Sequence, residues 1–243
     1  MTHAEDPKHL TFWFDPGAPL AHLAFERLPQ QLEGVSYSVA YRPVHLSRVL
    51  AHAAQATQTT QTTQTNPAEI EAQRVWSLRH AHAFAQQHGI DFAAPAQHPF
   101  DSTALVQLLL ACVSPALGTP NRFVCETVLR HVWRGGADAN DAQRLAALTL
   151  ALAPRTDPAE ARVNRVQQAL QEATAQALAL GIVDVPTIEV DTHLFCGLDA
   201  LPRLSAYLRG GAGFDSGGGG AAGAAGPVWD APPGLDSAGA RPD

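Results

Sequence analysis

Cysteine is scarce in this 243-residue sequence, and the few cysteines lie far apart. The three residues, Cys112, Cys125 and Cys196, form no CxxC pair and no spacing typical of metal ligands. A dithiol disulfide oxidoreductase needs two neighbouring cysteines in its active-site turn, so the sequence excludes that class. Because the number is odd and no secretory signal is expected, we predict three buried free thiols.

The sequence also lacks an excess of positive charge and a metal-binding motif. Its 16 Lys and Arg residues are outnumbered by 23 Asp and Glu residues, which gives a net charge of -7. No basic stripe is therefore available for a phosphate backbone, and nucleic acid is excluded as a partner. Eleven histidines are present, but His80 and His82 cannot share one helix face and no HExxH spacing occurs. The sequence predicts no metal site and favours a small-molecule partner.

No long apolar run is present either. Residues 1–9 lack the apolar core of a secretory signal. No stretch approaches the ~20 apolar residues that are needed to span a bilayer. We therefore predict a cytoplasmic protein that does not bind a membrane.

An alternation of strand and helix signals opens the chain. Residues 10–15 (LTFWFD) are rich in aromatic side chains and apolar on both faces, as in a strand that helices cover on each side. Pro16-Gly17 predicts a turn, and apolar residues at helical spacing predict a helix from Pro19 to just before Gly34. Residues 35–44 show period-two alternation, which predicts a second strand and completes a βαβ unit.

A long helical block separates this unit from a return to β structure. A tract rich in Gln and Thr predicts an exposed loop at residues 51–66. Apolar periodicity and punctuating prolines then predict helices at about 68–88, 102–117, 122–134, 139–152 and 158–180. Residues 187–191 and 194–196 predict a hairpin, residues 198–208 a final helix, and the Gly-, Ala- and Pro-rich residues 210–243 a disordered tail.

Several short motifs occur in a characteristic order along the chain. They are residues 12–23 (FWFDPGAPLAHL), 41–43 (YRP), Trp76 and Phe84, residues 88–90 (HGI), Asp101-Ser102, residues 185–187 (VPT) and residues 194–199 (LFCGLD). Over about residues 10–209 the chain thereby resembles the 2-hydroxychromene-2-carboxylate isomerases, a DsbA-like family related to the kappa-class glutathione transferases.

The resemblance implies an α/β fold, with a thioredoxin-like four-stranded mixed sheet, a large all-helical insertion and a disordered C-terminal tail. It assigns residues 10–50 and 182–209 to the thioredoxin-like domain and residues 67–181 to the helical insertion domain.

The resemblance also implies a chemistry. In this family the thiol of glutathione lies at the N-terminus of the first helix, where free amides and the helix dipole favour the thiolate. The thiolate adds to a conjugated double bond, the resulting single bond rotates, and elimination recycles glutathione. A family serine donates a hydrogen bond to the sulfur, but the matching residue here is Ala18. Such a bond is worth about 1.5–3 kcal/mol, so its loss implies a slower enzyme. His22, one turn further on, either reaches the sulfur or packs against the insertion.

Further glutathione contacts follow from the same resemblance. Val185 and Pro186 match a cis-proline loop whose backbone pairs with an extended thiol peptide, although a trans proline that starts an edge strand would have the same sequence. Asp199 matches an aspartate that receives the γ-glutamyl ammonium group, and it could also cap the final helix. The residue after it, usually arginine, is Ala200. Asn66 matches an asparagine that contacts the glutathione backbone, or it forms a turn.

The sequence therefore predicts a glutathione-dependent isomerase of the 2-hydroxychromene-2-carboxylate type, with glutathione as cofactor and a small aromatic compound as substrate. Ala18 and Ala200 support a second hypothesis, a non-catalytic protein that binds glutathione or another ligand. A kappa-like glutathione transferase is a third. The resemblance also implies a homodimer.

Overall fold

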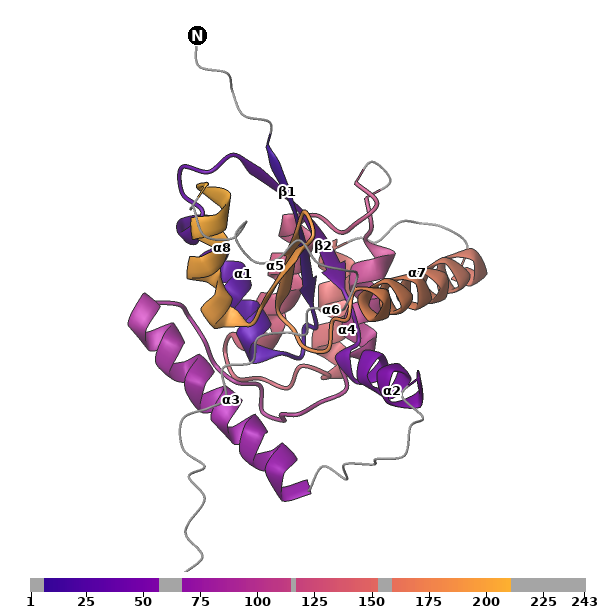
Figure 1. The fold of residues 1–243 in the computed structure, drawn as a ribbon. Helices are drawn as coiled ribbons and strands as arrows, with labels where there is room; N and C mark the ends of the chain where they lie inside the picture. Colours follow the sequence, from indigo (N-terminus) through magenta and orange to yellow (C-terminus); the bar gives the residue numbers. More distant parts are fainter. Residues whose placement is uncertain (1–6, 57–66, 115–116, 153–158, 211–243) are drawn as a thin grey trace, which may run out of the picture.

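Four strands form one mixed sheet in the order β2-β1-β3-β4 (Figure 1). The computed structural model describes residues 7–56, 67–114, 117–152 and 159–210. Strands β1 (Lys8–Phe14) and β2 (Tyr37–Pro43) run parallel, whereas β3 (Thr187–Val190) is antiparallel to β1 and β4 (His193–Cys196) is antiparallel to β3. The four-stranded mixed sheet that the sequence predicts is confirmed.

The sheet is a middle layer because consecutive side chains of β1 enter two different cores. Phe12 and Phe14 belong to the larger core, which includes residues of α1 (Pro19–Gln31) and α8 (Leu201–Leu208). Trp13 points the other way and packs with residues of α2 (Leu46–Ala56) and α7 (Ala159–Ala179). Figure 1 shows α1 and α8 on one side of the strands and α2 and α7 on the other. The apolar character of β1 on both faces is explained by this double cover.

The helices between β2 and β3 join the larger core. After α2, the chain forms α3 (Pro67–His88), α4 (Thr103–Ala111), α5 (Arg122–Trp133) and α6 (Ala142–Leu152) before α7. Both α3 and α5 contact α1. Val128 and Leu129 of α5 share one apolar cluster with Phe12 of β1. The packing between sheet and insertion is therefore continuous around α1, and the boundaries of the two predicted domains stay a prediction.

Helix α2 corrects the sequence analysis, which assigns no helix to this segment. The exposed loop predicted for residues 51–66 is wrong for residues 51–56, which form the second half of α2. The physical reason is that Val49 is fully buried in the cluster around Trp13, and this burial anchors a helix whose second half is rich in alanine. Residues 57–66, with most of the Gln/Thr tract and Asn66, lie outside the described residues, as does the predicted tail from residue 211 onward.

Two further expectations need correction. The helix predicted for residues 102–117 ends at Ala111, because the chain then turns back through backbone hydrogen bonds from Ser114 N to Thr119 O and from Gly118 N to Ser114 O.

The exposure of the cysteines also differs from the prediction. Of the three thiols expected to be buried, Cys125 is buried and Cys112 is half-buried, but Cys196 is exposed. Cys196 ends β4, an edge strand of the sheet, whose alternate side chains face outward. Burial raises the pKa values of the Cys112 and Cys125 thiols.

Candidate functional site

Three chain segments that carry predicted site residues meet at one edge of the sheet. Strands β1 and β2 are parallel, so the turn after Phe14 and the segment after Pro43 leave the sheet at the same edge. Strand β3 is antiparallel to β1, and its first residue, Thr187, pairs with Trp13 near the end of β1. The Val185–Pro186 loop therefore lies at this edge as well. Ligands of open α/β sheets commonly bind outside such strand ends.

The turn between β1 and α1 is fixed by Asp15, a buried carboxylate that is 6 % exposed. Its Oδ1 accepts a hydrogen bond from the backbone N–H of Gly17 (2.8 Å), and its Oδ2 accepts one from the backbone N–H of Leu46 (2.9 Å). The first contact shapes the turn, and the second ties it to the start of α2. Asp15 thus holds the N-termini of α1 and α2 next to each other.

The N-terminus of α1 carries no negative charge of its own. Ala18 is the N-cap and provides no side-chain acceptor, Pro19 occupies the first helical position, and the first turn contains no acidic residue. No group within the helix therefore balances the positive end of its dipole, and the nearby Asp15 carboxylate is bonded to the amides of Gly17 and Leu46. Ala18 is half-buried, and its methyl group packs against both apolar cores.

The Val185–Pro186 peptide bond is cis, as the resemblance implies. Val185 is buried in the same apolar cluster that Ala18 contacts, so the loop lies beside the start of α1. The carbonyl of Pro186 accepts a hydrogen bond from Gly197 N (2.8 Å). The amide of Val185 donates to Oδ1 of Asp184 (2.8 Å), whose pKa is raised by burial. A peptide ligand that paired with this amide would have to displace the Asp184 carboxylate.

Residues of the helical insertion also bond the turn between β1 and α1. The indole Nε1–H of Trp133, a fully buried residue at the end of α5, donates to the carbonyl of Pro16 (2.9 Å). His98 Nε2 donates to the carbonyl of Gly17 (3.3 Å). A Cβ atom on Gly17 would lie 3.3 Å from Asp15 Oδ1 and 3.4 Å from Cβ of Ser102. The turn is thus enclosed tightly enough that glycine suits position 17.

His22 lies inside the protein and not on the site surface. Its side chain is fully buried, and its ring stacks on that of Phe92 with centroids 6.4 Å apart. Burial lowers the pKa of His22 to about 4, against a smaller opposing effect of the Glu26 carboxylate. The geometry matches the alternative in which His22 packs as an aromatic residue against the insertion.

Asp199 lies where the final helical segment begins, two residues after Gly197, whose amide bonds the carbonyl of Pro186 in the cis-proline loop. It belongs to the 3-10 turn η1 (Leu198–Ala200), and its side chain is 81 % exposed. Its Oδ1 lies 3.8 Å from Nε2 of His80 on α3. Neither η1 nor α8 has a side-chain cap, so the proposed capping role of Asp199 is wrong. The carboxylate is accessible to a ligand, whereas Ala200 is buried.

One polar cluster at the site was missed by the sequence analysis. His45 lies two residues after the end of β2. Its Nε2 donates to Oδ1 of Asp101 (3.2 Å), and its Nδ1 accepts from the hydroxyl of Ser47 (2.8 Å). Hydrogen bonds from Thr103, and then from His45, lower the pKa of Asp101 to about 2. A polar residue shortly after a parallel strand was the available signal, but its partner Asp101 is 56 residues away.

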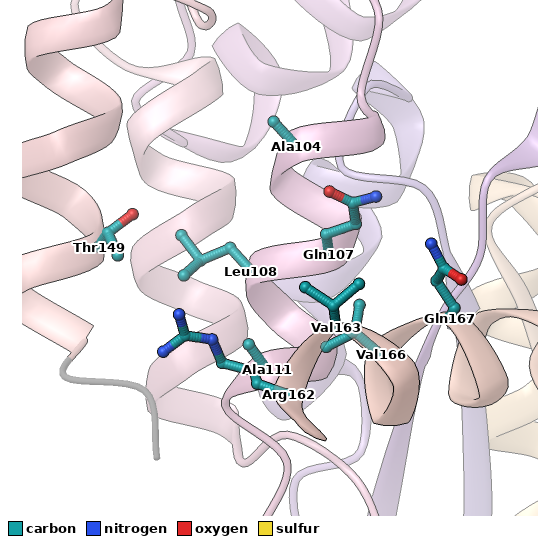
Figure 2. Close-up of a pocket in the computed structure, with 9 residues that line it drawn as sticks. All are labelled: Ala104, Gln107, Leu108, Ala111, Thr149, Arg162, Val163, Val166 and Gln167. Carbon is teal, nitrogen blue, oxygen red and sulfur yellow. The ribbon is translucent and has the colours of Figure 1, made fainter. Parts of the chain in front are cut away.

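A separate pocket of about 300 Å³ lies between α4, α6 and α7. Figure 2 shows Gln107 and Gln167 on one side of it and Leu108 with the guanidinium of Arg162 on the other. None of the predicted site residues lines this pocket.

Across the ranges that the structure covers, no cluster of His, Cys, Asp and Glu could hold a metal ion. Within the same ranges, no helix combines the length and the apolar character that crossing a membrane requires.

Comparisons with known proteins agree with the sheet topology. The family model of the DsbA-like thioredoxin domain matches residues 9–209. A solved 2-hydroxychromene-2-carboxylate isomerase superposes with a TM-score of 0.62 at 17% identity, over 83% of this chain and 94% of that chain. A putative protein disulfide isomerase from Nitrosomonas europaea gives a TM-score of 0.52 at 16% identity, over 86% of this chain and 100% of that chain.

A probable DsbA oxidoreductase from Streptomyces coelicolor also gives a TM-score of 0.52 at 16% identity, over 84% of this chain and 90% of that chain. No curated protein matches the chain at a significant level. At these identities the likeness to solved structures shows the fold.

Proposed function

Because the chain belongs to the DsbA-like thioredoxin family, we propose that it is a glutathione-dependent isomerase of the 2-hydroxychromene-2-carboxylate type. The observation that carries the proposal is the start of α1, which has no side-chain cap and no acidic residue in its first turn and lies beside the cis-proline loop. The turn that leads into this helix contains no cysteine. The turn itself therefore supplies no thiol, and in this proposal the reacting thiol comes from a bound molecule. The proposal fits the resemblance to an isomerase structure in fold.

The residues of the chain have separate tasks in this proposal. When bound, glutathione supplies a thiolate that adds to a conjugated double bond of the substrate and is eliminated after rotation. The N-terminus of α1 stabilises the negative charge on sulfur. The exposed carboxylate of Asp199 receives the ammonium group of the γ-glutamyl residue. The carbonyl of Val185 is the backbone acceptor beside Pro186, since its amide is already bonded to Asp184.

Two observations favour a second candidate, a protein that binds glutathione or a related ligand without turnover. Ala18 gives no hydrogen bond to the sulfur, and the Val185 amide is occupied by Asp184. Both features weaken the contacts that the chain can make to a thiol peptide, whereas the N-terminus of α1 remains available to an anionic group. The homodimer that the resemblance implies is part of the proposal for either candidate.

The substitution Ala18→Ser tests whether the site is catalytic. If glutathione binds at the start of α1, a serine there restores a hydrogen bond to the sulfur, and the glutathione-dependent rate should rise about 10-fold or more. The measurement is the isomerisation of 2-hydroxychromene-2-carboxylate at fixed pH, with and without glutathione. Ala72→Ser, on the exposed surface of α3, is the matched control and should leave the rate unchanged.

The outcomes separate the two candidates. Glutathione-dependent turnover that the serine increases supports the isomerase. Binding of glutathione without turnover in either protein supports the non-catalytic alternative and contradicts the isomerase.

A further inference from the structure

His45 makes hydrogen bonds with both ring nitrogens. Its side chain is 12 % exposed, between Asp101, which precedes α4, and Ser47 in the first turn of α2. The Asp101 carboxylate can only accept, so the Nε2 of His45 carries a proton and the neutral ring has a free lone pair on Nδ1. The hydroxyl of Ser47 donates to that lone pair at 2.8 Å. This order of serine, histidine and aspartate is the arrangement with which proteins move a proton from a nucleophile to an imidazole.

This chain of hydrogen bonds is attached to the turn that starts α1. Val44 N donates to the carbonyl of Phe14 (2.9 Å), and Leu46 N donates to Oδ2 of Asp15 (2.9 Å), so the residues on both sides of His45 are bonded to the end of β1 and its turn. Val44 packs in the apolar cluster that Ala18 contacts. His45 and Ala18 therefore lie at the same edge of the sheet, and the fold positions them independently of any ligand.

Asp101 is itself held in a fixed orientation. Its Oδ1 accepts from the backbone N–H (2.9 Å) and the hydroxyl (2.6 Å) of Thr103, and its carbonyl accepts from the side-chain amide of Asn140 (3.0 Å). The charged groups on the segments around His45 are Asp15 in the turn, Asp101 before α4 and Arg48 on α2. Two of these three groups are carboxylates, which attract the positive charge that the ring gains when it accepts a proton.

We propose that His45 is the base that accepts the thiol proton of the ligand at the start of α1, in place of the hydroxyl that Ala18 lacks; this inference rests on the proposed function. The S–H bond breaks with its electron pair left on sulfur. The proton passes to Oγ of Ser47 as the hydroxyl proton of Ser47 moves to Nδ1 of His45. The products are a thiolate and an imidazolium ion, whose charge is balanced by Asp101, and the proton returns when the thiol is re-formed.

The proposal assigns to His45 the task for which His22 is unsuited. His22 is fully buried against Phe92, with no path to a ligand at the start of α1. His45 has its proton donor on the exposed residue Ser47. A base that shares the proton in this way lowers the pKa of the bound thiol and so restores thiolate that the Ala18 methyl group cannot stabilise.

The test is the pH titration of the bound thiol, followed by the ultraviolet absorbance of the thiolate in the complex of the full-length protein with glutathione. His45→Gln and Ser47→Ala should each raise the pKa of the bound thiol by about one unit, which reduces the thiolate fraction near neutral pH about 10-fold. Asp101→Asn should raise it less, since asparagine keeps an acceptor for Thr103 and loses only the charge. His52→Gln is the matched control, because His52 is exposed on α2 and bonds only the carbonyl of Arg48 (2.9 Å).

Calorimetric titration with glutathione accompanies each variant. Glutathione binding with an unmoved thiol pKa in His45→Gln and Ser47→Ala overturns this inference and leaves the proposed function standing. Absence of glutathione binding to the unmodified protein overturns both. Ser47 is exposed, so Ser47→Ala is expected to fold. If His45→Gln does not fold, the thiol pKa in Ser47→Ala alone tests the inference.

Discussion

Two histidines, His22 and His45, differ in chemistry because their surroundings differ. His22 is fully buried against Phe92, and burial lowers its pKa so that the ring stays neutral near pH 7. His45 lies at the sheet edge with a carboxylate on one nitrogen and a hydroxyl on the other. Both residues are candidates for proton transfer by residue type. Only the surroundings of His45 suit this role, because its ring is bonded to a carboxylate and to an exposed hydroxyl.

His22 should make the protein less stable in mild acid. The unfolded ring takes up a proton with a pKa of 6.5, whereas the folded ring resists protonation until about pH 4. Between these values the unfolded state binds more protons, so stability falls as the pH is lowered through this window. His22→Phe keeps an aromatic ring on Phe92 and removes the titration. At pH 5 relative to pH 8, the variant should lose about 2 kcal/mol less of its free energy of unfolding than the unmodified protein does.

Urea unfolding at the two pH values measures this difference. His52→Gln, which removes an exposed histidine, should retain the pH dependence of the unmodified protein. An equal loss of stability in His22→Phe and in the unmodified protein would show that His22 does not carry the acid sensitivity.

At the scale of elements, the turn between β1 and α1 depends on helices that lie far away in sequence. Trp133 at the end of α5 and His98 before α4 bond the carbonyls of Pro16 and Gly17. Glu26 of α1 is paired with Arg130 (3.0 Å) of α5 and with Arg134 (3.2 Å) just beyond it. Burial disfavours the charge on Glu26, but the hydrogen bond and charge of Arg130 outweigh it and lower the pKa of Glu26. Helix α1 is therefore held at its start and at its middle by the same insertion helix.

The substitution Trp133→Phe tests this clamp. It leaves the carbonyl of Pro16 without its donor inside the protein and opens a small cavity, so the free energy of unfolding should fall by about 2–3 kcal/mol. Trp76→Phe is the matched control, because Trp76 is 52% exposed and its replacement should change stability by less than about 0.5 kcal/mol. Denaturant unfolding of both variants measures these changes in the free energy of unfolding. Equal stabilities of the two variants would mean that the turn does not depend on Trp133.

At the scale of the whole molecule, patterns that are local in sequence predict most of the fold. The apolar run of β1, the period-two alternation of β2 and the final hairpin predict the strands, and their order predicts the mixed sheet. Helix α2 was not predicted, because residues 51–56 were assigned to the loop that contains the Gln/Thr tract, although they continue the helix that Val49 anchors. The apolar residues of this amphipathic helix pack in the Trp13 cluster, and this tertiary contact stabilises the helix.

The site divides in the same way. Ala18 and the cis-proline loop are recognisable from short motifs, since each depends on adjacent residues. The link between His45 and Asp101 joins the end of β2 to a segment of the insertion, and no periodicity relates two residues so far apart. The clamp by Trp133 is invisible in the sequence for the same reason. Packing between sheet and insertion, and not local pattern, completes the site.

Calorimetric titration of the full-length protein with glutathione tests the central claim most directly. The start of α1, the cis-proline loop and Asp199 together predict saturable binding of one glutathione per chain, and Asp199→Asn should weaken it by up to about five-fold, as expected for an exposed ion pair. Saturable heat that Asp199→Asn reduces is the predicted result. No heat of binding at millimolar glutathione would contradict the account.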